Sequence, residues 1–231
     1  MRVGIAGYGV VGKTRHRSIE SNTSYQVTAI SESSEKARKS IPEGMTVYND
    51  YKTLIASAEL DVIFISLPNQ FAAEAACLSL QNGLHVFCEK PPARTHAELL
   101  EVEKQSLKFP ELKLMYGFNH RFHLSVEEAK LLIDSNSLGR LINMKGVYGK
   151  SQMISFNQTD WRTDREASGG GILLDQGIHM LDLMRYLSGE NFTDVFSIID
   201  NAFWNFDVED NAYVLMKSPK GLVAQLHSSA T

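Results

Sequence analysis

The sequence predicts an α/β fold with two domains, a doubly wound parallel sheet followed by an α+β domain with a mainly antiparallel, open sheet. In the first half, short apolar runs alternate with amphipathic stretches, which is typical of βαβ units. These apolar runs are continuous, as in strands that are covered on both faces. After about Phe118 the pattern changes, and three strand-like runs follow one another without helices between them. We therefore expect domains over residues 1–118 and 119–231.

Short runs rich in Val, Ile and Phe are the expected strands of the first domain. Amphipathic stretches between them predict helices, including residues 10–20, 70–81 and 96–107. The second of these ends at Asn82-Gly83, which suits a left-handed cap, and Thr95 with Glu98 predicts a capping box before the third. The strands are expected at residues 3–6, 26–30, 45–48, 62–66, 85–88 and 113–116.

The second domain is expected to combine two helices with an open sheet. A polar loop is expected over residues 152–168, and the stretch from Ser218 to Gly221 predicts a hairpin turn before the last strand. That strand stands directly before Thr231, where we expect it to leave an unpaired edge. We therefore expect this domain to be incomplete at its C-terminus. Its helices are expected at residues 125–134 and 172–187, and its strands at residues 141–148, 194–199, 211–217 and 222–228.

The composition excludes several classes of protein. The net charge of -4 offers no basic excess with which to bind nucleic acid. No apolar run reaches the roughly 20 residues that a membrane span needs. Cys77 and Cys88 are the only cysteines, so we expect neither a disulfide framework nor a metal site. The apolar stretch at the N-terminus is too short for a signal peptide, because glycines interrupt it within the first nine residues. We expect a cytoplasmic protein that binds neither nucleic acid nor membranes.

A glycine-rich turn follows the first expected strand and opens a helix. Gly7 permits a tight turn, Gly9 lets the backbone approach a pyrophosphate, and Gly12 lets the helix lie close to the sheet. The helix N-terminus would present N–H groups and a positive dipole end to the phosphates. Such turns also occur for steric reasons alone, but the place between strand and helix favours dinucleotide binding. The residues expected to bind are Gly7, Tyr8, Gly9, Val10, Val11 and Gly12.

The end of the second expected strand leaves the choice between NAD and NADP open. An acidic residue there accepts hydrogen bonds from the ribose hydroxyls of NAD. In this chain Ser31 takes that place and would tolerate a 2′-phosphate, whereas Glu32, one residue later, would repel one. Lys36 or Arg38 could supply compensating charge or could lie in solvent. The cofactor is expected to be NAD or NADP, with both Ser31 and Glu32 beside it.

Two further segments are expected at the edge where the strands end, because doubly wound sheets bind their ligands there. The fourth strand leads into Leu67, Pro68 and Asn69, and the fifth leads into Glu89 and Lys90. A lysine held at this edge could lower the pKa of a substrate hydroxyl or stabilise the alkoxide that forms as hydride leaves. The alternative is that Glu89 and Lys90 are an ordinary surface charge pair.

A run of glycines, Gly169 to Gly171, precedes the second group of candidate residues. Asp175 and His179 stand four residues apart on an expected helix, so both side chains should project from one face. A carboxylate beside an imidazole holds its tautomer and raises its basicity, as general acid–base catalysis requires. The glycines would let a ring approach the backbone. The alternative is a capped helix with a structural histidine.

Three other clusters are noticeable in the sequence. One has a structural interpretation, and the roles of the other two stay open. The basic stretch 14–17 is expected to be an exposed helix face rather than a phosphate clamp. His120 and His123 flank Arg121, and one of these histidines could touch a substrate. The aromatic run 203–206 could serve a subunit interface or the mouth of a substrate site.

These segments together resemble the glucose–fructose oxidoreductase / inositol dehydrogenase (Gfo/Idh/MocA) family over essentially the whole chain. Single motifs are moderate signals, but their order and distances make a strong one. The matching pieces are the glycine loop, Pro68-Asn69, Glu89-Lys90-Pro91, Gly117-Phe118-Asn119 with Arg121, and the run from Gly169 through Asp175 to His179.

The resemblance implies a Rossmann domain that binds NAD or NADP, and hydride transfer between nicotinamide and a carbinol carbon of a sugar, inositol or nucleotide-sugar. It implies that Lys90, Asp175 and His179 surround the reacting carbon. His179 would be the general acid/base, Lys90 would polarise the same oxygen, and Asp175 would position the substrate. It also implies a homo-oligomer built through the C-terminal sheet where that sheet is complete. The further residues that it places near the cofactor or substrate are Glu89, Asn119, Trp161 and Arg162.

The chain departs from the family in three ways. Many relatives carry a histidine shortly after Pro-Asn, where this chain has Gln70, Phe71 and Ala72. Ser31 replaces the usual acidic residue, and relatives continue well beyond the position of Thr231. A non-catalytic dinucleotide sensor of the same fold is therefore the alternative function. The retention of a lysine, an aspartate and a histidine argues against it, because a sensor needs no proton-transfer groups.

Overall fold

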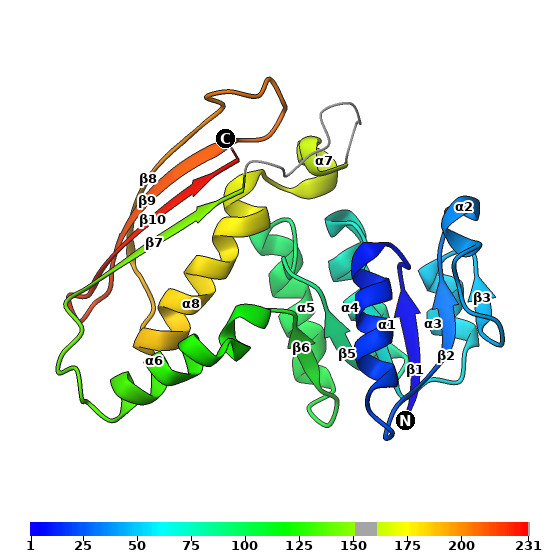
Figure 1. Ribbon diagram of the computed structural model, residues 1–231. Coiled ribbons are helices and arrows are strands. Elements are labelled where there is room, and N and C mark those ends of the chain that lie inside the picture. The colour runs from blue at the N-terminus through cyan, green and yellow to red at the C-terminus, as the bar shows by residue number, and fades with distance from the viewer. Residues whose placement is uncertain (151–160, 231) are drawn as a thin grey trace. The chain divides into compact units, whose positions relative to one another are not determined.

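The computed structural model describes residues 1–150 and 161–230 and divides the chain into two compact units. The first unit is Met1–Gly117 and the second is Phe118–Thr231 (Figure 1). Most of the expected polar loop over residues 152–168 lies outside the described residues. Among the helices that the structure describes, none is long and apolar enough to cross a membrane.

A six-stranded parallel sheet forms the centre of the first unit, with the strand order β3-β2-β1-β4-β5-β6 (Figure 1). This order confirms the expected doubly wound fold. The strand order runs outward in opposite directions from β1 and β4, and doubly wound sheets bind their ligands at this point. The strands are β1 (Arg2–Ala6), β2 (Gln26–Ser31), β3 (Thr46–Tyr48), β4 (Val62–Ile65), β5 (His85–Cys88) and β6 (Leu114–Tyr116).

The two faces of this sheet bury separate cores. On one face Ile63 and Ile65 pack with apolar residues of three helices, and on the other Ile5 and Ile30 pack with Ile19 of α1. Neighbouring strand residues therefore serve opposite cores, which explains why the apolar runs are continuous. The helices are α1 (Val10–Glu20), α2 (Glu35–Arg38), α3 (Tyr51–Ser57), α4 (Asn69–Gln81) and α5 (His96–Lys108).

The expected helix signals are present, with one difference. Gly83 follows α4 with a φ of 76°, the left-handed conformation that glycine adopts without strain. The hydroxyl of Thr95 accepts the backbone N–H of Glu98 at 3.2 Å and begins α5. The carboxylate of Glu98 accepts the backbone N–H of Arg94 at 2.9 Å, so the reciprocal bond reaches one residue further back than a capping box predicts.

The second unit contains a four-stranded sheet with the order β7-β10-β9-β8. Two of its pairings are antiparallel and the pairing of β10 with β7 is parallel, so the sheet is mixed but mainly antiparallel, as expected. Its strands are β7 (Asn143–Gly149), β8 (Asp194–Asp200), β9 (Asn211–Lys217) and β10 (Val223–Ser229). The remaining elements are α6 (Leu124–Asp134), α7 (Arg165–Ser168), α8 (Ile178–Ser188), the 3₁₀ turns η1 (Asn119–Phe122) and η2 (Trp161–Thr163), and the π turn η3 (Leu173–Gly177).

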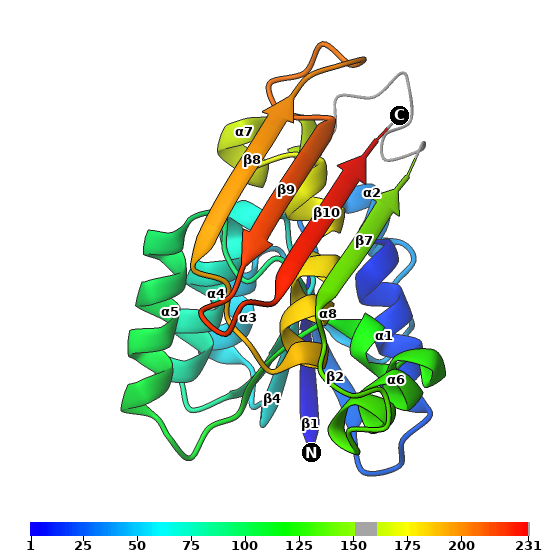
Figure 2. The same cartoon turned by 90° about the vertical axis from the view of Figure 1, so that its left-hand side faces the viewer.

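One face of this second sheet is covered and the other is open. Figure 2 shows the four strands side by side in front of α8. Met184 of α8 is buried against Val214 and Leu226 on the covered face. On the open face Phe196 is 66% exposed and Leu215 is 51% exposed. The open sheet that the sequence predicts is therefore present.

Two expectations for the second unit are wrong. The last strand, β10, is not an edge, because it lies between β7 and β9, and the edges are β7 and β8. Residues 161–168, expected to be loop, contain η2 and α7. The helix expected over residues 172–187 is present, and its first turn is the π turn η3, which continues directly into α8. The turn from Ser218 to Gly221 is confirmed by the hydrogen bond from the Gly221 N–H to the Ser218 carbonyl at 3.0 Å.

A buried carboxylate, Asp210, organises the aromatic loop that follows β8. It accepts the backbone N–H groups of Ala202, Phe203 and Trp204 at 2.8, 2.8 and 2.6 Å. Burial favours the neutral acid, but these donors and the amide of Asn211 outweigh it and hold the pKa of Asp210 below its ordinary value. The folded protein therefore stabilises the ionised carboxylate of Asp210 more than the unfolded chain does.

We expect Asp210→Asn to lower the free energy of unfolding at pH 7 by about 1–3 kcal/mol, since charge-assisted hydrogen bonds are lost. A depressed folded pKa stabilises the protein above the unfolded pKa of about 4, and this stabilisation disappears as the pH falls through the lower folded pKa. The difference between wild type and variant should therefore shrink in acid. Urea unfolding at several pH values measures it, with the exposed Asp194→Asn as control. A difference that is constant with pH contradicts the interpretation.

Candidate functional site

Two glycines of the loop in the first unit, Gly7 and Gly12, lie where backbone atoms leave no room for a side chain. The N–H of Gly7 donates to the Ser31 carbonyl at 2.9 Å, and its φ of 88° is left-handed. A Cβ on Gly12 would lie 2.0 Å from the carbonyl oxygen of Gly7. Helix α1 therefore begins directly against the end of β1, as the sequence predicts.

Gly9 differs from these two glycines, because a Cβ added to it would meet nothing within 4 Å. It is the N-cap of α1, and Val10 and Val11, the first helical residues, are 83% and 41% exposed. The backbone N–H groups of such a first turn have no partners inside the helix and attract anions. An open approach beside these groups fits the pyrophosphate of a dinucleotide.

Tyr8 contributes its backbone to the loop and its side chain to the core. Its N–H donates to Oε2 of Glu32 at 2.9 Å. Its ring is 4% exposed, and its hydroxyl lies 2.6 Å from Nδ1 of the buried His16. Burial raises the pKa of this phenol, and the carboxylate of Glu20 adds to the effect. The side chain of Tyr8 is therefore a neutral structural group.

Glu32, rather than Ser31, places an acidic group beside the glycine loop. Ser31 is 2% exposed and its hydroxyl is buried within the first unit. The carboxylate of Glu32 accepts the N–H of Tyr8, and its Oε1 accepts the N–H of Ser34 at 2.8 Å. The sequence had left the roles of the two residues open, and the geometry assigns the charge next to the loop to Glu32.

The segment after β4 lies at the same edge of the sheet. The N–H of Ser66 donates to the Ala6 carbonyl at 2.8 Å, and a Cβ on Gly7 would lie 2.5 Å from the Ser66 carbonyl oxygen. Leu67 packs against the core, Pro68 is the N-cap of α4, and Asn69 is its first residue and 7% exposed. The predicted group is thus brought beside the glycine loop.

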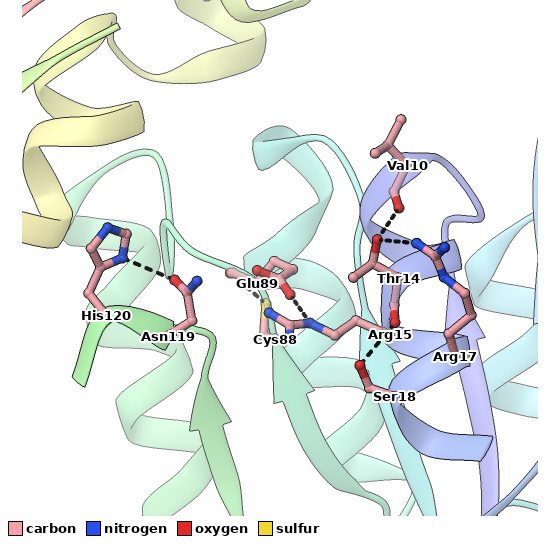
Figure 3. A network of polar contacts seen from close by, with 9 residues as sticks. All are labelled: Val10, Thr14, Arg15, Arg17, Ser18, Cys88, Glu89, Asn119 and His120. Carbon is pink, nitrogen blue, oxygen red and sulfur yellow. Dashed lines mark hydrogen bonds and ion pairs between the residues drawn. The ribbon is translucent and has the colours of Figure 1, made fainter. Parts of the chain in front are cut away.

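Glu89, after β5, is fixed by contacts within the first unit. Its N–H donates to the Ile65 carbonyl at 2.9 Å, and its Oε1 accepts the Nε of Arg15 at 2.5 Å (Figure 3). It is followed by the partly exposed Lys90 and by a cis peptide bond to Pro91. The interpretation of Glu89 and Lys90 as a surface pair is therefore wrong for Glu89.

The basic stretch of α1 is also different from the expected exposed helix face. His16 is 2% exposed, and its Nε2 lies 3.3 Å from the Glu20 carboxylate. Arg15 keeps 24% of its side chain exposed in the ion pair with Glu89. Of the three basic residues, Arg17 alone is exposed. Arg15 and His16 are therefore not exposed as expected, because each has a partner outside the helix, Glu89 and Tyr8, that the helical period does not reveal.

The second unit gathers a cluster of rings around His179 of α8, which is 5% exposed. The ring of His120 is tilted against it with 4.1 Å between the centroids. Tyr148 of β7 stacks at 6.0 Å and Phe118 approaches edge-on at 6.2 Å. Nδ1 of His120 lies 3.2 Å from Oδ1 of Asn119 (Figure 3). His120, which the sequence left undecided, is therefore a direct neighbour of His179.

Asp175 lies in the π turn that continues into α8, four residues before His179. Its Oδ2 accepts the side-chain amide of Gln176 at 2.7 Å. Burial raises the pKa of Tyr148, and the charge of Asp175 adds to the effect. Tyr148 is thus a phenol beside the histidine cluster and near this carboxylate, and no sequence motif pointed to it.

The remaining candidate residues of this unit are Arg121 and the predicted pair Trp161 and Arg162. Nε of Arg121 donates to Oδ2 of Asp182 at 2.7 Å, and the guanidinium lies over the Tyr186 ring. The guanidinium of Arg162 lies 4.3 Å from the centroid of Trp161. Arg121 therefore pairs with Asp182 and contacts Tyr186, both of α8.

The predicted site residues fall into two local groups. The glycine loop, Glu32, the segment after β4 and the Glu89-Lys90 pair gather at the sheet edge of the first unit, while Asn119, Asp175 and His179 belong to the second. Within the described residues no cluster of three His, Cys, Asp or Glu side chains could hold a metal ion.

Several known proteins that this chain resembles are named as dehydrogenases. D-glucoside 3-dehydrogenase of Escherichia coli is 30% identical over 82% of this chain, and myo-inositol 2-dehydrogenase of Thermotoga maritima is 25% identical over 99%. The crystal structure of levoglucosan dehydrogenase with NADH and levoglucosan matches with a TM-score of 0.89 at 25% identity, over 100% of this chain and 67% of that one. The chain spans 54% of the length of the first relative and 68% of the second.

Two family models divide the chain between them. Residues 1–116 match the oxidoreductase family with an NAD-binding Rossmann fold, and residues 126–231 match the Gfo/Idh/MocA C-terminal domain. The glycine loop, the Glu-Lys-Pro segment and the histidine of α8 lie in the segments that these models cover. The chain belongs to the Gfo/Idh/MocA family of NAD-binding oxidoreductases.

Proposed function

We propose that this protein transfers hydride between a nicotinamide dinucleotide and a carbinol carbon of a sugar or cyclitol. The observation that carries this proposal is the open approach at Gly9 beside the N-terminus of α1, in a chain of this family. The bound cofactor would supply the redox chemistry, and the protein would supply orientation and proton transfer.

We propose distinct roles for three side chains. His179 is the general acid/base for the substrate hydroxyl, Lys90 polarises the same oxygen, and Asp175 positions the substrate. The burial of His179 among His120 and Tyr148 supports its role, because a dry, polar neighbourhood strengthens proton transfer and charge stabilisation. Asn119, Trp161 and Arg162 are proposed to lie near the cofactor or substrate.

The substrate class is supported by the names of the relatives, which are dehydrogenases of a glucoside, of levoglucosan and of inositols. All three name a ring compound that carries neighbouring hydroxyl groups. We therefore propose a ring carbinol as the oxidised group. The test is oxidation of a panel of sugars and cyclitols with NAD, measured by absorbance of NADH. Binding of NADH without turnover of any of them contradicts the proposal.

The domain roles and the assembly are part of the same proposal. Residues 1–118 would hold the cofactor, and residues 119–231 would contact substrate and form a homo-oligomer through the open sheet, whose exposed Phe196 and Leu215 support it. A cytoplasmic location is supported by the two free thiols of Cys77 and Cys88.

We propose NAD rather than NADP as the preferred cofactor, because the Glu32 carboxylate beside the loop would repel a 2′-phosphate. NADH should bind at least about tenfold more tightly than NADPH, as expected for like charges at close range. Glu32→Gln keeps the shape and removes the charge, so the preference should largely disappear. Fluorescence titration with both cofactors measures it, and Glu35→Gln on the exposed α2 is the control. Equal affinities in the wild type would refute the proposal.

A further inference from the structure

An ion pair joins the helix of the glycine loop to the segment that precedes Lys90. Figure 3 shows Arg15 extending from α1 to the Glu89 carboxylate, with Nε 2.5 Å from Oε1. The side chains keep only 24% and 17% of their surface exposed. An exposed pair contributes little to stability, whereas a partly buried one is less screened by solvent. We therefore expect this ion pair to hold the two side chains in a defined position.

The guanidinium of Arg15 is held from a second side by aromatic rings of the sheet. Its central carbon lies 5.0 Å from the centroid of the Phe87 ring, and Phe87 stacks on Phe64 at 4.9 Å. Arginine over an aromatic face is stabilised by the charge distribution of the ring, more so where water is excluded. The guanidinium of Arg15 thus has a defined place over the Phe87 ring of β5.

Glu89 is fixed at its backbone and at one carboxylate oxygen, Oε1, which Arg15 binds. Its N–H is bound to Ile65, and its carbonyl accepts the Cys88 thiol at 3.4 Å. A Cβ on Gly117 would lie 2.7 Å from Oε2, so the missing side chain of Gly117 makes the space that this carboxylate fills. The carboxylate is therefore built into the end of the sheet, with Arg15 as its cation.

The other titratable groups packed here are neutral near pH 7. Burial raises the pKa of the Cys88 thiol, and the Glu89 charge adds to it. Burial also raises the pKa of the Tyr116 hydroxyl on β6. Arg15 and Glu89 thus form the ion pair at this end of β5, and Lys90 follows Glu89 directly in the chain.

We propose that Arg15 is a positioning residue, which holds the Glu89 carboxylate and thereby fixes the course of the chain that presents Lys90. The proposal rests on the function assigned to Lys90 above and adds to it a residue of α1. It also joins the helix that receives the phosphates to the segment that carries the reactive ammonium. Loss of Arg15 would free Glu89 and let Lys90 adopt other positions.

A double-mutant cycle separates positioning from a general effect on charge. The variants are Arg15→Met, Glu89→Gln and both together, with Arg15→Lys as the conservative change and Arg17→Met, exposed on the same helix, as the control. The first readout needs no substrate: acetic anhydride labels lysine amines in the cofactor-free protein over a range of pH, and mass spectrometry gives the rate at Lys90. Lys52 and Lys104 serve as internal references.

We expect Arg15→Met to change the labelling rate of Lys90 by about threefold or more, and Arg15→Lys to restore most of the difference. In the Glu89→Gln background, Arg15→Met should have little further effect, because its partner is already absent. An unchanged rate at Lys90, or the same change in both backgrounds, overturns the proposal. If Arg15→Met does not fold, Glu89→Gln still decides, since it should change the labelling rate of Lys90 while Lys52 and Lys104 keep theirs, and Arg15→Lys should stay close to the wild type.

Turnover gives the second readout. Misplacement of a catalytic group by a fraction of an ångström to one ångström costs about tenfold or more in rate, so Arg15→Met should lower kcat by about this factor while KM changes much less. The labelling cycle remains valid if Lys90→Met retains activity. In that case the role proposed for Lys90 fails, while the coupling of Arg15 to Lys90 is judged separately. A larger effect on KM than on kcat contradicts a positioning role.

Discussion

His179→Ala is expected to lower kcat by between about 10²- and 10⁴-fold, the usual contribution of a positioned general acid or base. The imidazole is buried beside His120 and Tyr148, so water could not replace it in a defined position. NADH affinity should be unchanged, because the glycine loop belongs to the first unit and keeps all its contacts. Steady-state turnover and fluorescence titration measure the two quantities.

The control for this variant is His96→Ala, which removes an exposed imidazole at the start of α5. Its kcat should equal that of the wild type. A kcat of His179→Ala within about tenfold of the wild type would show that proton transfer does not depend on this side chain. A parallel loss of NADH affinity would indicate instead that the variant disturbs the fold.

Local sequence signals were enough to predict the first unit. Continuous apolar runs gave the parallel strands, and the order of strands, turns and helices gave the doubly wound sheet, because each signal lies within a few neighbouring residues. The same holds for the glycine loop, whose three glycines each meet a requirement set by the backbone around residues 7–12. Gly7 and Gly12 are fixed by steric contact, and Gly9 by the space beside it.

Contacts between distant residues were beyond the reach of the same signals. The sequence predicted that Arg15 and His16 lie on an exposed face, because the helical period shows only which residues share a face of one helix. Their burial depends on partners outside that helix, Glu89 for Arg15 and Tyr8 for His16. Glu32 turns its carboxylate to the loop because the N–H of Tyr8 is available there. No periodic pattern in the sequence encodes these pairings.

The second unit shows the same difference at the level of topology. The strand runs were located correctly, but the position of β10 inside the sheet could not be predicted, because pairing order depends on which strands meet after folding. His120 and His179 are 59 residues apart in sequence, and the contact of their rings follows from the packing of η1 against α8. The spacing of residues along the helix could indicate only Asp175, a near neighbour in sequence, as a partner of His179.

Gly9→Ala is expected to weaken NADH binding by about 10- to 100-fold while the protein stays folded. The added methyl group meets no atom of the protein within 4 Å, so the free energy of unfolding should change by less than about 1 kcal/mol. It would instead occupy the space beside the first-turn N–H groups of α1 that the pyrophosphate needs.

Gly12→Ala separates this effect from damage to the fold. Its Cβ would lie 2.0 Å from the Gly7 carbonyl oxygen, so α1 must shift and the free energy of unfolding should fall by about 1–3 kcal/mol or more, together with NADH affinity. Gly149→Ala, whose Cβ also meets nothing within 4 Å, is the control and should alter neither quantity. Urea unfolding and NADH fluorescence distinguish the three variants. If Gly9→Ala binds NADH as the wild type does, the phosphates lie elsewhere, and the loop is a steric turn without a ligand.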